Sequence, residues 1–200
     1  ASVQSTSGAA AVRQVYQFTA AVGGTGRGIF TAPATGGTGT FVYQWESSVN
    51  NTTWTAIGGA TNATFTPGAL GVTTYFRRQV RSSACPNTPS NTVTITVLPA
   101  LTAGSIAASQ TVCAGTPPAP FTSTAPATGG TGSFVYQWES SANSSTWTPI
   151  GGATGPTYAP GQLTAATYYR RRASSGSACA PALSNVVTIT VTPALTAGTI

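Results

Sequence analysis

The chain has 200 residues, of which 40% are hydrophobic and 5% are charged, and its net charge of +6 comes from eight Arg and two Glu. Lys, Asp, His and Met are absent. Ordinary globular proteins carry about 25% charged residues, so this composition leaves few groups for acid–base or metal-dependent catalysis. We expect no enzymatic activity, no cofactor and no metal site.

The same composition argues against two classes of partner. Most of the arginines lie in one repeated strand, at 77–81 and 170–172, and no Lys supports them. Nucleic-acid binding by counterion release needs a broader basic surface. No run of eighteen apolar residues occurs, whereas a membrane-spanning helix needs about twenty. We therefore expect neither nucleic-acid binding nor membrane insertion.

The chain contains the same sequence nearly twice. Residues 31–60 read TAPATGGTGTFVYQWESSVNNTTWTAIGGA, and residues 124–153 differ from them at only five of thirty positions. The match continues to the end, where NTVTITVLPALTAGSI (91–106) returns as NVVTITVTPALTAGTI (185–200). A period near 93 residues is too long for a solenoid unit and suits a domain of about 100 residues with its own core.

Strand patterns follow one another along both repeats. Aromatic and polar residues alternate in the first repeat from Phe41 to Glu46, which is the period of a half-buried strand. Further strands are predicted in the first repeat at 53–57, 64–66, 73–81 and 93–97. Those of the second repeat are predicted at 103–112, 121–124, 134–139, 146–150, 156–159, 167–173 and 187–191. About seven short strands per repeat, with no helical period, predict an all-β chain of tandem immunoglobulin-like β-sandwich domains.

The repeat also predicts the boundaries. Residues 1–30 do not resemble 101–123, and we interpret them as an N-terminal arm or the first strands of domain 1, with a donor strand or linker as alternatives. Residues 31–99 form domain 1 and residues 100–193 form domain 2. Residues 194–200 repeat the start of domain 2, so they are either the first strand of a following repeat or a donor strand.

Four aromatic residues are predicted to be buried. Trp45 and Trp138 lie in the middle of the third strand, where immunoglobulin-like sandwiches keep a core Trp. Tyr75 and Tyr168 each follow a Leu by five residues at the start of a late strand, a spacing that resembles the tyrosine corner. We predict all four as core residues.

The two acidic residues occupy the same repeat position, beside a strand rich in Arg. The predicted ion pairs are Glu46 with Arg77 or Arg78, and Glu139 with Arg170 or Arg171. An exposed pair of this kind contributes on the order of 0–1 kcal/mol, so we interpret both pairs as devices that fix the strand register.

Three cysteines leave one without a partner inside its own domain. Cys113 and Cys179 fall in domain 2, and we predict a disulfide between them. In the chain-entropy model such a bond stabilises the domain by roughly 4 kcal/mol, and it implies an oxidising location outside the cytoplasm. Cys85 is the counterpart of Cys179, while Ala20 matches Cys113. Cys85 is then free, bonded to another chain, or paired with Cys113.

Four motifs recur together and in order: TAPATGGTGxFVYQWESS, TWTxIxGAT, TTYFRR or ATYYRRR, and SNVVTITVTPALTAGTI. They resemble the immunoglobulin-like tandem repeats of very large secreted and cell-surface, adhesin-type proteins of Bacteroidota that leave the cell by type IX secretion. The resemblance covers residues 31–200. It implies an extracellular or cell-surface location and an adhesive or scaffold role.

Three functions compete. The first is a structural subunit of an extracellular filament or surface fibre, a homopolymer assembled head to tail by strand addition. Its assembly strand is Leu195, Thr196, Ala197, Gly198, Thr199 and Ile200. The second is a segment of a long tandem-repeat adhesin. The third is a carbohydrate-binding module in which Trp54 and Trp147 stack on surface glycans.

Overall fold

The computed structural model describes residues 17–21, 33–83 and 85–198. The chain separates into two compact units, Ala1–Val97 and Leu98–Ile200, which are called domain 1 and domain 2 from here on.

Every regular element in the described part of the chain is a β-strand. The strands of the first repeat are β1 (Gln17–Ala21), β2 (Val42–Ser48), β3 (Thr55–Ala56), β4 (Thr74–Arg81), β5 (Thr88–Pro89) and β6 (Val93–Leu98). Those of the second are β7 (Ser105–Ile106), β8 (Gln110–Cys113), β9 (Ser123–Ala125), β10 (Val135–Ser141), β11 (Thr148–Pro149), β12 (Thr167–Ser174), β13 (Ala182–Leu183) and β14 (Val187–Thr192).

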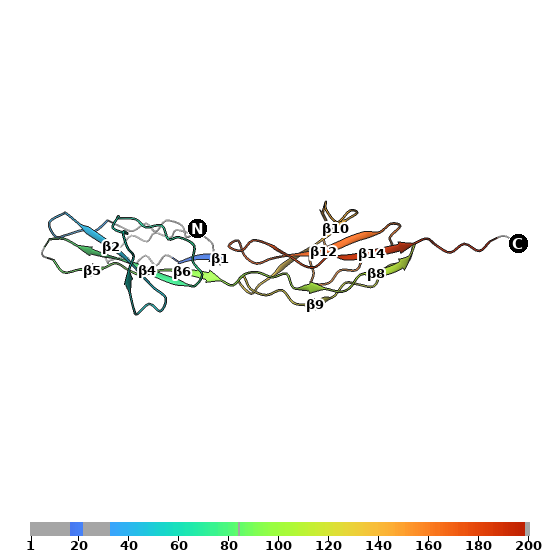
Figure 1. Ribbon diagram of the computed structural model, residues 1–200, viewed down its shortest axis with the longest axis horizontal. Coiled ribbons are helices and arrows are strands. Elements are labelled where there is room, and N and C mark those ends of the chain that lie inside the picture. Colours follow the sequence, from blue (N-terminus) through green and yellow to red (C-terminus); the bar gives the residue numbers. More distant parts are fainter. Residues whose placement is uncertain (1–16, 22–32, 84, 199–200) are drawn as a thin grey trace. The chain divides into compact units, whose positions relative to one another are not determined.

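Each domain is built on one large sheet with the same strand order. In domain 1 the order is β1-β6-β4-β2-β3, and in domain 2 it is β8-β14-β12-β10-β11 (Figure 1). β5 also pairs with β4, as β13 does with β12. β8 runs parallel to β14. Because β1 lies beside β6 as β8 lies beside β14, part of the predicted N-terminal arm is an edge strand of domain 1.

A second, smaller sheet covers the large sheet of domain 2. β7 pairs with β9, and isolated bridges join Thr102 to Thr128 and Phe121 to Tyr158. Two layers of mostly antiparallel strands around one core are the arrangement of an immunoglobulin-like sandwich. The predicted all-β fold is confirmed.

The register of the two central strands decides which side chains enter the core. Trp45 lies opposite Arg78 and Glu46 opposite Arg77 in the β2–β4 pair. Since successive side chains point to opposite faces of a sheet, Trp45 and Arg78 share the inner face, and Glu46 and Arg77 share the outer one. The β10–β12 pair repeats this register in domain 2.

An aromatic cluster forms the core of domain 2. Trp138 is fully buried and stacks on Phe121, with 5.6 Å between ring centroids. Phe121 also contacts Tyr169, at 5.2 Å. The indole N–H of Trp138 donates to the Gly155 carbonyl at 3.0 Å, so the one polar atom of the ring is satisfied. In domain 1, Trp45 is equally buried.

The two tyrosines that the sequence predicts in the core each lie one position before the aromatic residue that is buried. Tyr75 and Tyr168 are half-buried on the outer face, whereas Phe76 and Tyr169 lie in the core. The prediction of Tyr75 and Tyr168 as core residues was therefore wrong. The physical reason is the period of two: a shift of one residue moves a side chain to the other face of the sheet.

An arginine takes part in the core of domain 2. The Arg171 side chain has no exposed surface. Its guanidinium lies 4.4 Å from the Tyr136 ring centroid and 5.9 Å from that of Trp138. Burial lowers the pKa of Arg171 from its ordinary value, and Tyr136 partly opposes this shift. Because arginine stays protonated in proteins, a full positive charge is held inside the sandwich.

Hydrogen bonds from Arg171 join the two sheets. Its Nη2 donates to the Ala103 carbonyl at 2.9 Å, and its Nη1 donates to the Pro156 carbonyl at 2.7 Å and to the Ser123 hydroxyl. Immunoglobulin domains carry an inter-sheet disulfide beside the core Trp, and its second Cys stands two residues after a Tyr. Arg171 stands two residues after Tyr169. A guanidinium therefore joins the sheets where an immunoglobulin domain has a disulfide.

Arg78 occupies the equivalent place in domain 1. It is buried, lies 4.3 Å from the Tyr43 ring centroid, and donates from Nη1 to the Ala63 carbonyl at 2.6 Å. Burial lowers the pKa of Arg78 as well, with Tyr43 opposing the shift. The inner arginine is thus a feature of both repeats.

The predicted disulfide of domain 2 is not present, because Cys85, Cys113 and Cys179 are all free thiols. Cys113 lies opposite Thr192 at the end of β14, whereas Cys179 follows the far end of β12. From the paired residues Tyr169 and Val187 the two strands extend in opposite directions, at about 3.3 Å per residue. The two cysteines thus lie at opposite ends of the sheet, and a disulfide needs Cα atoms within about 7 Å.

Replacing Arg171 with Ala is expected to destabilise domain 2 by about 3 kcal/mol or more, because the change opens a cavity and leaves buried carbonyl acceptors unpaired. Arg172→Ala, at an exposed position of the same strand, is the matched control and should cost less than about 0.5 kcal/mol. Denaturant-dependent hydrogen exchange, read on peptides from domain 2 of the full chain, measures both. Equal losses of unfolding free energy in the two variants would contradict the role of Arg171 in joining the sheets.

The stability of domain 2 is expected to fall as the pH rises above about 10. Burial raises the pKa of Tyr169, with a smaller contribution from Tyr158. The unfolded chain loses this proton near pH 10 while the folded domain keeps it, so the free energy of unfolding decreases with pH in that window.

The Tyr169→Phe variant should lose this part of the pH dependence, because it has no phenol at that position. Urea unfolding near pH 8 and above pH 10, resolved by domain, provides the measurement. Domain 1 serves as an internal control because Phe76 occupies the matching place. An unchanged slope in the variant would show that other tyrosines cause the decrease.

Candidate functional site

The described residues contain no cluster of three or more His, Cys, Asp and Glu that could hold a metal ion. They also include no helix with the length and apolar character to cross a bilayer. Two other features stand out. The first is a stack of Trp, Arg and Glu on the outer face of the large sheet in each domain, and the second is the segment through which the chain enters domain 2.

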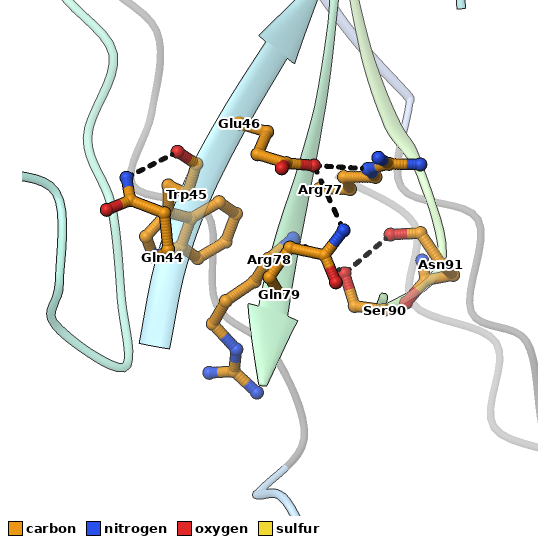
Figure 2. Close-up of polar contacts among 8 residues, drawn as sticks. All are labelled: Gln44, Trp45, Glu46, Arg77, Arg78, Gln79, Ser90 and Asn91. Carbon is orange, nitrogen blue, oxygen red and sulfur yellow. Dashed lines mark hydrogen bonds and ion pairs between the residues drawn. The ribbon is translucent and has the colours of Figure 1, made fainter. Parts of the chain in front are cut away.

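In domain 1 the outer stack is formed by Glu46, Arg77 and Trp54. Arg77 Nε donates to Glu46 Oε2 at 2.6 Å, and Gln79 Nε2 reaches the same oxygen at 3.2 Å. The Arg77 guanidinium lies 4.2 Å from the Trp54 ring centroid. Figure 2 shows Arg77 and Gln79 converging on Glu46, while the Arg78 side chain lies apart from them. Of the two predicted partners, Glu46 therefore contacts Arg77.

Domain 2 repeats the stack with Glu139, Arg170 and Trp147. Arg170 Nε donates to Glu139 Oε2 at 2.6 Å, and the guanidinium lies 4.1 Å from the Trp147 ring centroid. The Glu139 side chain is only 8% exposed, compared with 17% for Glu46. Because one face of each Trp ring is covered by a guanidinium, the predicted glycan platforms Trp54 and Trp147 have at most one face to offer a sugar.

The second feature is the place where the chain enters domain 2. This entry segment is residues 99–107, which include β7. The Pro99 carbonyl accepts from Gly130 N–H at 2.9 Å, and Thr102 and Thr128 exchange backbone hydrogen bonds of 2.9 and 3.2 Å. The hydroxyls of the two threonines are 2.7 Å apart. Main-chain bonds thus hold the entry segment along its length.

Side chains fix the position of the entry segment. Ala103 and Ile106 are buried, and Arg171 donates to the Ala103 carbonyl. Asn185 holds Ile106 by both backbone groups: its Oδ1 accepts from Ile106 N–H at 2.8 Å, and its Nδ2 donates to the Ile106 carbonyl at 3.2 Å.

One residue of the entry segment has to be Gly. Gly104 has a φ of +67°, and a Cβ built there would lie 2.2 Å from the Ala125 carbonyl oxygen and 2.4 Å from that of Pro126. Backbone atoms cannot move aside as a flexible side chain can, so any larger residue would push the segment off β9. The sequence LTAG is therefore well suited to this position.

Domain 1 carries the same receiving groups. At the offset of the repeat, Thr35 matches Thr128, Arg78 matches Arg171, and Asn91 matches Asn185. The turn after Thr35 also has the same backbone form: Gly36 and Gly37 have φ values of +87° and +58°, and their counterparts Gly129 and Gly130 have +82° and +56°. The described part of domain 1 thus repeats several of the residues, and the turn conformation, that contact the entry segment in domain 2.

The C-terminal segment of the chain repeats the entry segment in sequence. Residues 193–200 read PALTAGTI, and residues 99–106 read PALTAGSI. Within the described part, residues 193–198 are exposed and form no strand, and Leu195 is 98% exposed. Thr199 and Ile200 of the predicted assembly strand lie outside the described residues.

A comparison with protein families gives the same division of the chain. The family described as a domain of unknown function, DUF8696, matches twice, over residues 18–99 and 102–193. The chain belongs to the DUF8696 family. The first match begins inside β1, whereas the second begins at Thr102, within the entry segment. Comparison with curated proteins finds no match.

Solved structures agree on the fold. The I-band fragment I67–I69 of titin gives a TM-score of 0.54 at 13% identity, over 90% of this chain and 64% of that one. Three N-terminal domains of the Hoc outer capsid protein of bacteriophage RB49 give 0.54 at 10% identity, over 90% and 68%. Four immunoglobulin domains of Dscam1 give 0.42 at 15%, over 94% and 46%. The chain spans less than two thirds of the Dscam1 and titin fragments, and at such identities the likeness concerns the fold alone.

Sequence reasoning missed the inner arginine. It grouped Arg77 with Arg78, and Arg170 with Arg171, as alternative partners for one Glu, although the members of each pair point to opposite faces. In the structure Arg78 and Arg171 lie two residues after an aromatic residue of the inner face, Phe76 or Tyr169. That spacing places them inside the sandwich.

Replacing Glu139 with Gln is expected to destabilise domain 2 by about 1.5–3 kcal/mol, the range for a hydrogen bond to a charged group. Glu46→Gln in domain 1 is the matched variant. It should cost less, since Glu46 is more exposed and water can replace part of the lost bond. Domain-resolved hydrogen exchange in denaturant provides the measurement. Losses below about 0.5 kcal/mol in both variants would show that the pairs set register only.

Proposed function

We propose that the chain is a non-enzymatic structural subunit of an extracellular filament or surface fibre, assembled head to tail by strand addition. One observation carries this proposal: residues 193–200 repeat the segment that enters domain 2 and is held there by main-chain hydrogen bonds. A strand that binds mainly through its backbone can be supplied by another chain, because the hydrogen bonds do not depend on where the strand comes from.

The composition supports a polymer of this kind. Both carboxylates of the chain are already paired with arginines on the outer faces of their own domains. The remaining net charge is +6 on 200 residues, and physiological salt screens exposed charges that lie more than about 8 Å apart. A heterologous contact that does not close into a ring produces a fibre, and a C-terminal donor with an N-terminal receiver is such a contact.

An extracellular location follows from the family resemblance and suits this role. The motifs resemble repeats of secreted and cell-surface proteins, and the chain is similar in fold to three N-terminal domains of an outer capsid protein. The three free thiols mean that the described fold is complete without a disulfide.

Two alternatives compete with the fibre. In the first, the chain is a segment of a long tandem-repeat adhesin, and residues 194–200 begin the next repeat. This alternative shares the location and the fold and differs only in where the last strand binds. In the second, Trp54 and Trp147 bind surface glycans. It draws support from their half-buried rings but has to use the ring face that the guanidinium leaves uncovered.

Purified full-length chain is expected to form filaments visible by negative-stain electron microscopy, while a version ending at Pro193 stays dispersed. The truncation removes the assembly strand and leaves β14, which ends at Thr192, intact. Circular dichroism and thermal unfolding of the truncated chain provide the folding control. Dispersed particles from both versions would contradict the fibre and favour a segment of an adhesin.

A further inference from the structure

We propose that domain 2 has a mechanical function: it resists tension along the chain through the parallel pair of β8 and β14. This inference deepens the proposed function and rests on it, because a subunit within a fibre is pulled from both sides. A repeat within a long adhesin would be pulled in the same way. The seam that takes the tension consists of residues 106–114 and residues 185–192.

Backbone pairing of β8 with β14 forms the centre of the seam. The two strands pair in parallel over Gln110–Cys113 and Ile189–Thr192. The Ala114 N–H continues the ladder by donating to the Thr192 carbonyl at 2.9 Å. The pairing of β12 with β14 ends at Ile189, so in the described part of the chain the last residues of β14 have β8 as their neighbour in the sheet. Tension on the end of β14 therefore acts directly on β8.

Side-chain hydrogen bonds extend the seam toward its start. Ser109 Oγ accepts from Thr188 N–H at 2.9 Å. Asn185 bonds to both backbone groups of Ile106, at 2.8 and 3.2 Å. In each of these contacts the two residues are 79 positions apart in the chain, which is also the separation within the paired strands. One register therefore joins the two segments along their whole length.

The direction of the two strands decides how a pull on the chain acts on these bonds. Figure 1 shows β8 and β14 pointing the same way. The chain reaches β8 from the entry segment and leaves domain 2 after β14, so tension acts on the start of β8 and on the end of β14. In a parallel pair these two points lie at opposite ends. The strands are thus pulled past each other, and the bonds of the seam share the force.

The path of the force passes beside the aromatic core. The bonds of the entry segment are strained first, and the seam takes the full tension once they yield. β12 and β10, which contain Tyr169 and Trp138, lie on the side of β14 away from β8. Force that passes from β14 to β8 does not cross these strands. Resistance to force and stability in solution therefore depend on different residues, and the two can be measured separately.

Pulling the same domain in two directions tests the proposal. Optical tweezers stretch the full chain, with its three cysteines replaced by Ser, through handles on two introduced cysteines at exposed positions. Ala108→Cys with Ala194→Cys pulls the strands past each other, whereas Ala108→Cys with Val186→Cys separates them from one end. At one loading rate we expect the first pair to need about twice the unfolding force or more, because the force now acts against a higher unfolding barrier.

Urea unfolding of the two handle variants is the control, and it should give the same stability because each differs from the other at one exposed position. Equal unfolding forces in the two directions would overturn the proposal. So would a lower force through Ala108 and Ala194 than through Ala108 and Val186.

A single hydrogen bond of the seam tests which residues take the force. Thr192 Oγ1 donates to the Val112 carbonyl at 3.2 Å, and Thr192→Val removes this bond. In the Ala108 and Ala194 geometry at constant force, the variant should unfold about two- to tenfold faster, the effect of one typical hydrogen bond on the barrier. Thr190→Val, at an exposed position of the same strand, is the matched control and should unfold at the unchanged rate. Equal rates in the two variants would overturn the assignment to the seam.

The outcome is independent of filament formation, because the handles take the place of neighbouring subunits. Dispersed particles in electron microscopy, together with a higher force through Ala108 and Ala194, would reject the fibre and keep the mechanical function for a segment of an adhesin. Filaments together with equal forces in both directions would keep the fibre and reject the mechanical function.

Discussion

In domain 2 the guanidinium of Arg171 joins the large sheet to the small one, and the packing of the two layers around the core depends on this contact. Arg171 contacts the ring of Trp138 on its own sheet and donates to Ser123 and Ala103 on the other side. These bonds determine how the two layers are aligned. They also require a backbone carbonyl at Ala103, so the inter-sheet contact and the binding of the entry segment are one network. A disulfide would join the sheets without involving that segment.

The middle of the entry segment, residues 102–104, binds with little contribution from large side chains, whereas Ile106 further along is a core residue. Ala103 is small, Gly104 is required by its backbone geometry, and the threonine at 102 pairs with an identical residue across the strands. Such a segment is short and has an easily repeated sequence.

The outer faces use the few charges in a different way. Each domain places its only carboxylate against one Arg, and that Arg against one Trp. Half-buried pairs of this kind add a modest amount of stability, yet they are incompatible with a strand shifted by one residue, since the shift would move Glu139 into the core. Inner and outer arginines thus specify the same register from opposite sides of the sheet.

The sequence by itself determined the repeat, the all-β class, most strand positions and the burial of Trp45 and Trp138, because these depend on local periodicity and on near-identity between the halves. Which of two adjacent residues faces inward was decided only by the tertiary structure. Tyr75 precedes Phe76, and Arg77 precedes Arg78, so aromatic and basic residues occur on both faces and the period of two fits either choice. The tertiary structure also decided whether the two cysteines of domain 2 can form a disulfide. Cys113 and Cys179 belong to one domain, but the parallel pairing of β8 with β14 places them at opposite ends of the sheet, which no local pattern specifies.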